Sequence, residues 1–293
     1  MAGAILAVNK PVGPTSHDIT HRIKKLLKLP KVGHGGTLDP FASGVLIVVT
    51  GSCTKLMSYL SHSHKQYRAT LRLGTRTETA DTEGQVVETQ PVPTLSPQLL
   101  EQLSRELTGT VTLQVPAYSA VKIGGKKAYE YARRGESVEM PTRTTTLHSL
   151  RLWQEKPDGI EIDVDVSGGT YIRALGEEIA RRLGTVGHLC MLQRTRCCGI
   201  SVQECVSLTD FDPDTPWQHW SIPPARVLAD HDMYTADAAV ITHLRQGRPL
   251  DMSALSRLQK GDLQDNPTAV ILDESQNVIS IIDVRKNRVL RNI

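Results

Sequence analysis

The sequence has little that would support a disulfide, a metal site or a membrane span. It contains five cysteines in 293 residues, an odd number with no Cys-x-x-Cys pair, which argues against a disulfide framework and a zinc site. We therefore expect reduced thiols in a cytoplasmic protein. The longest strongly apolar run, Val45 to Val49, is too short to cross a membrane. The apolar run before Lys10 is too short for a signal peptide.

The net charge is also small, at +3, but its distribution along the chain is uneven. Residues 1–35 hold six Lys and Arg against one acid, and residues 122–151 hold seven against three. Residues 65–76 hold four basic residues and no acid, whereas residues 203–216 hold four acids and no base. Such patches are typical of proteins that bind a polyanion such as RNA. Ordinary solvated helix faces explain the same distribution equally well.

Internal repeats and low-complexity tracts are missing, so the residue patterns point to a compact mixed fold. Alternation from Lys65 to Leu73 predicts a half-buried strand with Tyr67 on its apolar side. Thr15, with Asp18 three residues later, predicts a capped helix start, and Tyr118–Lys122 is interpreted as a strand. Strand pairs of hairpin type outnumber strand–helix–strand units. The expected fold class is therefore α+β with a mixed, largely antiparallel sheet.

The Asp- and Pro-rich stretch from Leu208 to Pro224 is interpreted as a connection between two domains. Beyond it, Val270–Leu272 and Val278–Val284 predict short strands. We expect a catalytic domain over residues 1–222 and a small β-rich module over residues 223–293.

Four segments are candidates for chemistry. In the first, Asp39 lies in a glycine-rich loop directly before an apolar strand, although an ordinary Asp-Pro turn explains the pattern as well. This loop matches neither a Walker nor a dinucleotide fingerprint. In the second, a glycine pair precedes a helix whose first turn carries Arg173. The others are the Tyr118–Lys122 segment and Leu192–Arg196, where alternating basic residues indicate an exposed strand that faces RNA.

Together these segments resemble the bacterial tRNA pseudouridine synthases that modify the T arm. The resemblance covers about residues 5–200 and is carried by these blocks: Asn9-Lys10-Pro11, Gly13-Pro14-Thr15-Ser16, Gly33-His34, Leu38-Asp39-Pro40, Ser43-Gly44, Lys65, Tyr67-Arg68, Tyr118-Ser119-Ala120, Lys122, Ala128-Tyr129-Glu130, Gly169-Thr170-Tyr171-Ile172-Arg173, Leu192 and Arg194-Thr195. Two positions depart from the usual pattern. Gly35 stands where many members have Thr, and Gln193 where a second Arg is usual.

The resemblance implies a pseudouridine synthase catalytic fold followed by a small RNA-binding β module. It implies that a uridine is flipped out of the T loop of tRNA and isomerised without cofactor or metal. Asp39 would be the catalytic carboxylate, Arg173 its ion-pair partner and Tyr67 the ring that stacks on the base. His34 would fill the gap left in the RNA, and Leu192 would form an apolar wall. Substrate binding is further assigned to Lys10, Lys122 and Arg194.

The same resemblance implies a monomer that requires no protein partner and no membrane. Two other functions remain open at this point. A tRNA-folding chaperone would bind RNA without needing the carboxylate. A guide-RNA-dependent synthase would carry basic tails and a different C-terminal extension, which this sequence does not match.

Overall fold

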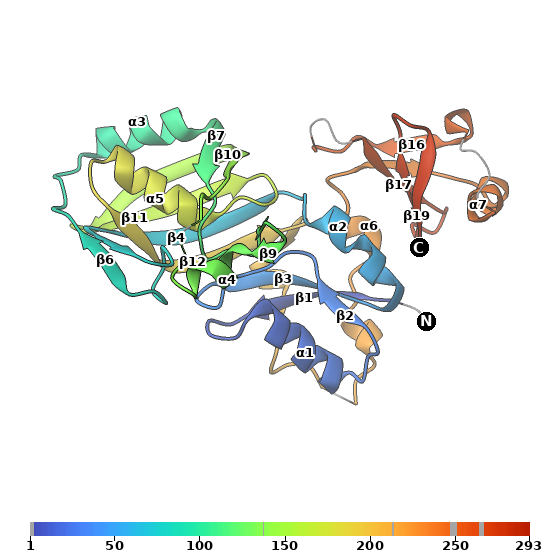
Figure 1. The fold of residues 1–293 in the computed structure, drawn as a ribbon. Helices are drawn as coiled ribbons and strands as arrows, with labels where there is room; N and C mark the ends of the chain where they lie inside the picture. Colours follow the sequence, from blue (N-terminus) through green and yellow to red (C-terminus); the bar gives the residue numbers. More distant parts are fainter. Residues whose placement is uncertain (1–2, 137, 213, 247–250, 264–266) are drawn as a thin grey trace. The chain divides into compact units, whose positions relative to one another are not determined.

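The computed structural model describes residues 3–136, 138–212, 214–246, 251–263 and 267–293 (Figure 1). The chain forms two compact units. The first is discontinuous in sequence and combines Met1–His64 with Thr195–Ile293, whereas the second comprises Lys65–Arg194. Within the described ranges, no helix has the length and apolarity that a membrane crossing requires.

The N-terminal part of the first unit is built on strands β1 and β3. They pair antiparallel, β2 pairs with β3, and β14 pairs parallel with β1. The elements of this unit are β1 (Ile5–Lys10), α1 (Ser16–Leu26), β2 (Val32–His34), β3 (Ser43–Thr50), η1 (Gly51–Leu56), α2 (Met57–Leu60), β13 (Ile200–Ser201), η2 (Val202–Glu204), β14 (Val206–Ser207), η3 (Trp217–Trp220), α6 (Pro224–Val227), β15 (Asp232–Thr235), α7 (Ala238–Arg245), η4 (Met252–Ala254), β16 (Ser256–Gln259), β17 (Thr268–Leu272), β18 (Val278–Asp283) and β19 (Arg288–Asn292).

Both faces of the β1–β3 pair are buried, and each face belongs to a different core. On one face Leu6 and Leu46 pack with Ile19 and Ile23 of α1. This explains why β3 is apolar at every position from Val45 to Val49, because a strand covered on both sides has no solvent face.

The other face of β1 and β3 belongs to a larger hydrophobic cluster that also includes Leu56, Leu60 and Val227 and extends to residues near the end of the chain. Ile5 and Ile47 share a core with Met233, Val270 and Ile281. The last three belong to a five-stranded sheet of order β16-β15-β17-β18-β19, which also has a separate core against α7. The C-terminal β module therefore completes the core of the N-terminal strands.

The second unit is a sheet of order β12-β4-β11-β10-β7 with helices packed against it. Its pairings of β4 with β11, of β11 with β10 and of β10 with β7 are all antiparallel. The elements are β4 (Lys65–Leu73), β5 (Thr75–Thr77), β6 (Val86–Thr89), α3 (Pro97–Leu107), β7 (Gly109–Gln114), β8 (Lys122–Ile123), β9 (Lys126–Lys127), α4 (Ala128–Ala132), β10 (Thr142–Lys156), β11 (Gly159–Val166), α5 (Ile172–Arg182) and β12 (Gly187–Cys197), whose last residues lie in the first unit.

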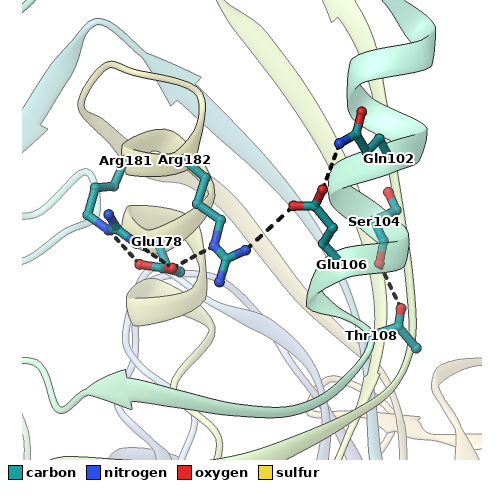
Figure 2. A network of polar contacts seen from close by, with 7 residues as sticks. All are labelled: Gln102, Ser104, Glu106, Thr108, Glu178, Arg181 and Arg182. Carbon is teal, nitrogen blue, oxygen red and sulfur yellow. Dashed lines mark hydrogen bonds and ion pairs between the residues drawn. The ribbon is translucent and has the colours of Figure 1, made fainter.

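Helix α5 lies close to the sheet and is held from the side by α3. A side chain at Gly176 would come within 3.0 Å of Leu189 and 3.3 Å of Leu71, so the glycine permits close packing. Figure 2 shows how the C-terminal end is fixed. Glu178 accepts hydrogen bonds from Arg181 and Arg182 on its own helix, and Arg182 also lies 3.7 Å from Glu106 of α3. The middle and the C-terminal end of α5, the helix that carries Arg173, are therefore constrained.

The fold class expected from the sequence, α+β with a largely antiparallel sheet, is confirmed. The capping box of α1 between Thr15 and Asp18 is present, and β4 alternates between buried and more exposed residues as predicted. The strand expected over Tyr118–Lys122 is wrong, because only Lys122–Ile123 is extended into a ladder. The carbonyls of Ser119 and Val121 accept bonds from the N–H groups of Tyr129 and Ala128 instead.

Candidate active site

Asp39 lies on a loop whose backbone is fixed at several points. The Ser16 hydroxyl donates to the Leu38 carbonyl at 2.9 Å and accepts from the Leu38 N–H at 2.8 Å. On the other side, the Gly13 N–H donates to the Pro40 carbonyl at 2.8 Å. The half-buried Asp39 is thus held between two anchored neighbours.

Lys10 is completely buried at the base of this loop. Its Nζ donates to the carbonyls of Ala42 at 2.6 Å, Pro11 at 2.9 Å and Pro40 at 3.2 Å. A buried ammonium needs such acceptors to offset the loss of hydration. The resemblance assigns Lys10 to substrate binding, and in the structure its side chain binds the backbone carbonyls of Pro40 and Ala42, which directly follow Asp39.

His34 and Gly35 precede the loop at the end of β2. His34 is half-buried and pairs with Val48 in the β2–β3 ladder. A side chain at Gly35 would lie 2.9 Å from Cβ of Leu60. The departure from the usual Thr therefore has a physical reason, because the first residues of this segment pack tightly on α2.

Tyr67 and Leu192 lie in the second unit. Tyr67 is 6% exposed on β4, on the same side as Ala69 and Leu71, and its register partner on β11 is Val164. Leu192 is 5% exposed on β12. Both side chains are buried, and their role in holding a base stays a prediction.

Arg173 lies in the first turn of α5 with its guanidinium turned inward. It is 5% exposed, and it donates to the Thr79 carbonyl at 2.7 Å and the Tyr118 carbonyl at 3.0 Å. Asp81, itself 2% exposed, places a carboxylate oxygen 3.5 Å from Nη1 of Arg173. This buried ion pair offsets the desolvation of the guanidinium. The pairing of Arg173 with Asp39 stays a prediction.

Asp81 is a site residue that sequence reasoning missed. In the sequence it stands in a polar turn before Gly84, where an aspartate is ordinary. Its other oxygen does accept from the Glu83 N–H at 2.9 Å, as an Asx turn requires. Its position 92 residues before Arg173 leaves no local signal of the ion pair.

Lys122 and Arg194 differ in exposure. Lys122 is exposed on the β8–β9 hairpin, opposite Lys127. Arg194 is 1% exposed and is among the largest fully buried side chains of the chain. The expected exposed, RNA-facing strand over 192–196 is therefore wrong at Arg194, because the alternation places Leu192 and Arg194 on the buried side of β12.

Ser119, next to the Tyr118 carbonyl that receives Arg173, has an unsatisfied hydroxyl. The residue is 4% exposed, and among the described residues its Oγ has no hydrogen-bond partner. An unpaired buried hydroxyl lowers stability by about 1–3 kcal/mol. No residue pattern indicates this, because a serine beside Ala120 can be solvated or buried with equal ease.

We expect Ser119→Ala to raise the melting temperature, because it removes a polar group that burial leaves unpaired. A gain of about 1 kcal/mol corresponds to roughly 2–4 °C, measurable by thermal unfolding. Ser104→Ala is the matched control, since that buried hydroxyl donates to Leu100 and accepts from Leu152. It should lower the melting temperature. A lower melting temperature for Ser119→Ala would show that its hydroxyl is satisfied.

The chain is similar to known proteins in both sequence and fold. The family model of TruB family pseudouridylate synthases (N terminal domain) matches residues 24–172, about half of the chain. The chain belongs to this family. The resemblance inferred from the sequence blocks is thereby confirmed.

Relatives named tRNA pseudouridine synthase B match this TruB-family chain over most of its length. The protein of Bacillus licheniformis is 44% identical over 220 residues, covering 72% of this chain and 71% of the relative. The protein of Mycobacterium sp. (strain KMS) is 35% identical over 292 residues, covering 97% of each chain. The fold is shared with a crystal structure of a Cbf5–Nop10–Gar1 complex at a TM-score of 0.75 and 23% identity, covering 95% of this chain and 77% of that one.

Glu177 is a second charged residue on α5 of this TruB-family chain, and its pKa is shifted by its surroundings. Burial raises the pKa of Glu177, one turn further along α5, while the charges of Arg76 and Arg173 partly oppose that rise. Glu177 also lines an open cavity of about 690 Å³ with Thr112, Gln114 and Arg76. The first two turns of the helix thus carry an arginine and a glutamate, and the arginine charge partly offsets the effect of burial on the pKa of the glutamate.

Proposed function

We propose that this protein converts a uridine in the T loop of transfer RNA to pseudouridine, with Asp39 as the catalytic carboxylate. The observation that carries the proposal is the anchoring of Asp39. Lys10, Ser16 and Gly13 fix the backbone around it, which is how a scaffold holds a reactive group in one geometry. A turn without a chemical role does not require a buried ammonium beneath it.

In the proposed reaction the bond between ribose C1′ and uracil N1 breaks, the base turns, and a bond forms between C1′ and C5. The hydrogen on C5 is lost and N1 gains one, so the reaction is an isomerisation that needs no external reactant. Asp39 either attacks the ribose or removes a proton from it, since both routes use an anionic oxygen beside an electron-poor sugar carbon.

The remaining site residues are proposed to hold the flipped nucleotide. Tyr67 stacks on the base, Leu192 forms an apolar wall, and His34 fills the gap left in the loop. Arg173 aims Asp39; a guanidinium has five N–H donors, so its bonds to Thr79 and Tyr118 leave room for a second carboxylate.

For the whole chain we propose a monomer that works in the cytoplasm and needs no protein partner. Residues 1–222 would hold the chemistry, and residues 223–293 would form an RNA-binding module. Because that module shares a core with β1 and β3, the division is one of function and not of independent folding.

The test uses unmodified tRNA labelled with tritium at uridine C5, incubated with the purified protein and a chelator. Formation of the C1′–C5 bond releases the label, so release that maps to the T loop is expected. The assay contains no guide RNA and no metal. Binding of tRNA without release would favour a chaperone, and release only after a guide RNA is added would favour the guided enzymes.

We expect Tyr67→Phe to keep the fold and tRNA affinity but to lower the single-turnover rate sharply, because the hydroxyl helps to move a proton on the base. Phe keeps the ring and its stacking face, so the stability change should stay near one hydrogen bond, about 1 kcal/mol. Single-turnover tritium release and thermal unfolding measure the two effects. A rate near that of the parent protein would confine Tyr67 to stacking.

A further inference from the structure

The guanidinium of Arg143 lies on the face of a glycine at the start of α5. Arg143 belongs to β10 and pairs with Leu113 of β7. A methyl group at Gly169 would lie 2.5 Å from its Nη2, 2.7 Å from its Cζ and 2.8 Å from its Nη1. The guanidinium therefore occupies the space that a side chain at position 169 would take. Gly169 also has φ of +84°, a conformation that glycine adopts without strain.

The turn beneath the guanidinium is tied to β10 by hydroxyl groups. The Ser167 hydroxyl lies 2.9 Å from that of Thr145 and accepts from the Thr146 N–H at 3.0 Å. The Thr170 hydroxyl donates to the Ser167 carbonyl at 2.9 Å and also contacts the Thr145 hydroxyl. These hydrogen bonds hold the turn against β10. The position of Gly169 beside Arg143 is therefore set by contacts within the fold.

The two arginines at this turn differ in charge compensation. Arg173 points inward and is paired with Asp81. Arg143 belongs to an exposed position, and within the described part of the chain no carboxylate forms an ion pair with it. The positive charge of Arg143 therefore lies at the surface beside Gly169, and Arg143 is two residues along the chain from Thr145, whose hydroxyl contacts Ser167 and Thr170.

We propose that Arg143 binds a phosphate of the RNA backbone beside the N-terminal end of α5. A planar guanidinium presents a fork of N–H donors that fits two phosphate oxygens at once. Lysine would carry the charge but could not lie flat on the glycine. The proposal rests on the proposed function in that the polyanion is the substrate RNA.

The first experiment measures tRNA affinity of the full-length protein as a function of salt. We expect Arg143→Gln to weaken binding about tenfold and to reduce the slope of log affinity against log salt by about one, as loss of one phosphate contact predicts. Arg151→Gln is the matched control, an exposed arginine of the same strand that stacks on Trp153 instead. It should leave affinity within about twofold and the slope unchanged.

The second experiment moves the guanidinium without removing it. Gly169→Ala places a methyl group in the space that the Arg143 guanidinium occupies. Gly184→Ala places one at a similar φ of +78° with no atom within 4 Å. Both variants carry the same backbone strain, so only Gly169→Ala should weaken tRNA binding. Added to Arg143→Gln, it should cause no further loss.

An unchanged salt slope for Arg143→Gln, or equal losses for the two glycine variants, would overturn the proposal. Affinity and tritium release are separate readouts. A parent protein that binds tRNA steeply with salt but releases no label would refute the proposed function and leave the role of Arg143 standing.

Discussion

Asp39→Asn is expected to bind tRNA with nearly unchanged affinity and to lose turnover, by about 10²–10⁴-fold or more. Asparagine has the shape of aspartate but neither its charge nor its basicity. The loop should keep its conformation, because Lys10 and Ser16 hold its backbone. Single-turnover tritium release, tRNA affinity and thermal unfolding together test this expectation.

Asp18→Asn is the matched control for that substitution. Asp18 is an exposed carboxylate of the same unit, and hydrogen bonds from Thr15 lower its pKa. Its replacement should weaken only the start of α1 and should leave the rate intact. If Asp39→Asn still converts uridine at more than a trace of the parent rate, Asp39 is only a turn residue.

Asp81→Asn is expected to lower the free energy of unfolding by about 3 kcal/mol and to reduce the rate. The substitution leaves the buried Arg173 without its negative partner, and breaking a buried pair in this way typically destabilises by about 3–5 kcal/mol. We place the effect at the lower end because Thr79 and Tyr118 still accept hydrogen bonds from Arg173. Urea unfolding measures the change.

Two further variants separate the charge effect from a general loss of packing. Asp163→Asn removes an exposed partner of Arg68, 3.8 Å away, and should change stability by less than about 0.5 kcal/mol. Adding Arg173→Met to Asp81→Asn should restore stability, since no charge is then left unpaired, but should not restore activity. Unchanged stability of Asp81→Asn would mean that another group compensates Arg173.

The elements that the sequence predicted are those whose signal is local. The alternation of β4 follows from which side of one strand is buried, and the cap of α1 involves residues three positions apart. The glycine-rich loop was recognised because turn residues have a characteristic composition. In these cases neighbouring residues determine the structure, so their pattern is readable without the rest of the chain.

The features that the sequence did not predict depend on partners far along the chain. Arg173 meets the Thr79 carbonyl across 94 positions, and Lys10 meets the Ala42 carbonyl across 32. A basic residue looks the same in a sequence whether it faces RNA or a set of carbonyls. Lys10 and Arg194 therefore looked like substrate contacts, although both side chains are buried.

The order in which the ribosome makes this chain differs from the order in which its cores can close. All of Lys65–Arg194 is available for folding once it has emerged, but the hydrophobic cluster that contains Ile5 and Ile47 is complete only when Val270 and Ile281 have been made. At about 5–20 residues per second, synthesis of the chain from Ile47 to Ile281 takes on the order of ten seconds or more. The first strand to be synthesised thus belongs to a hydrophobic cluster that is completed only near the end of translation.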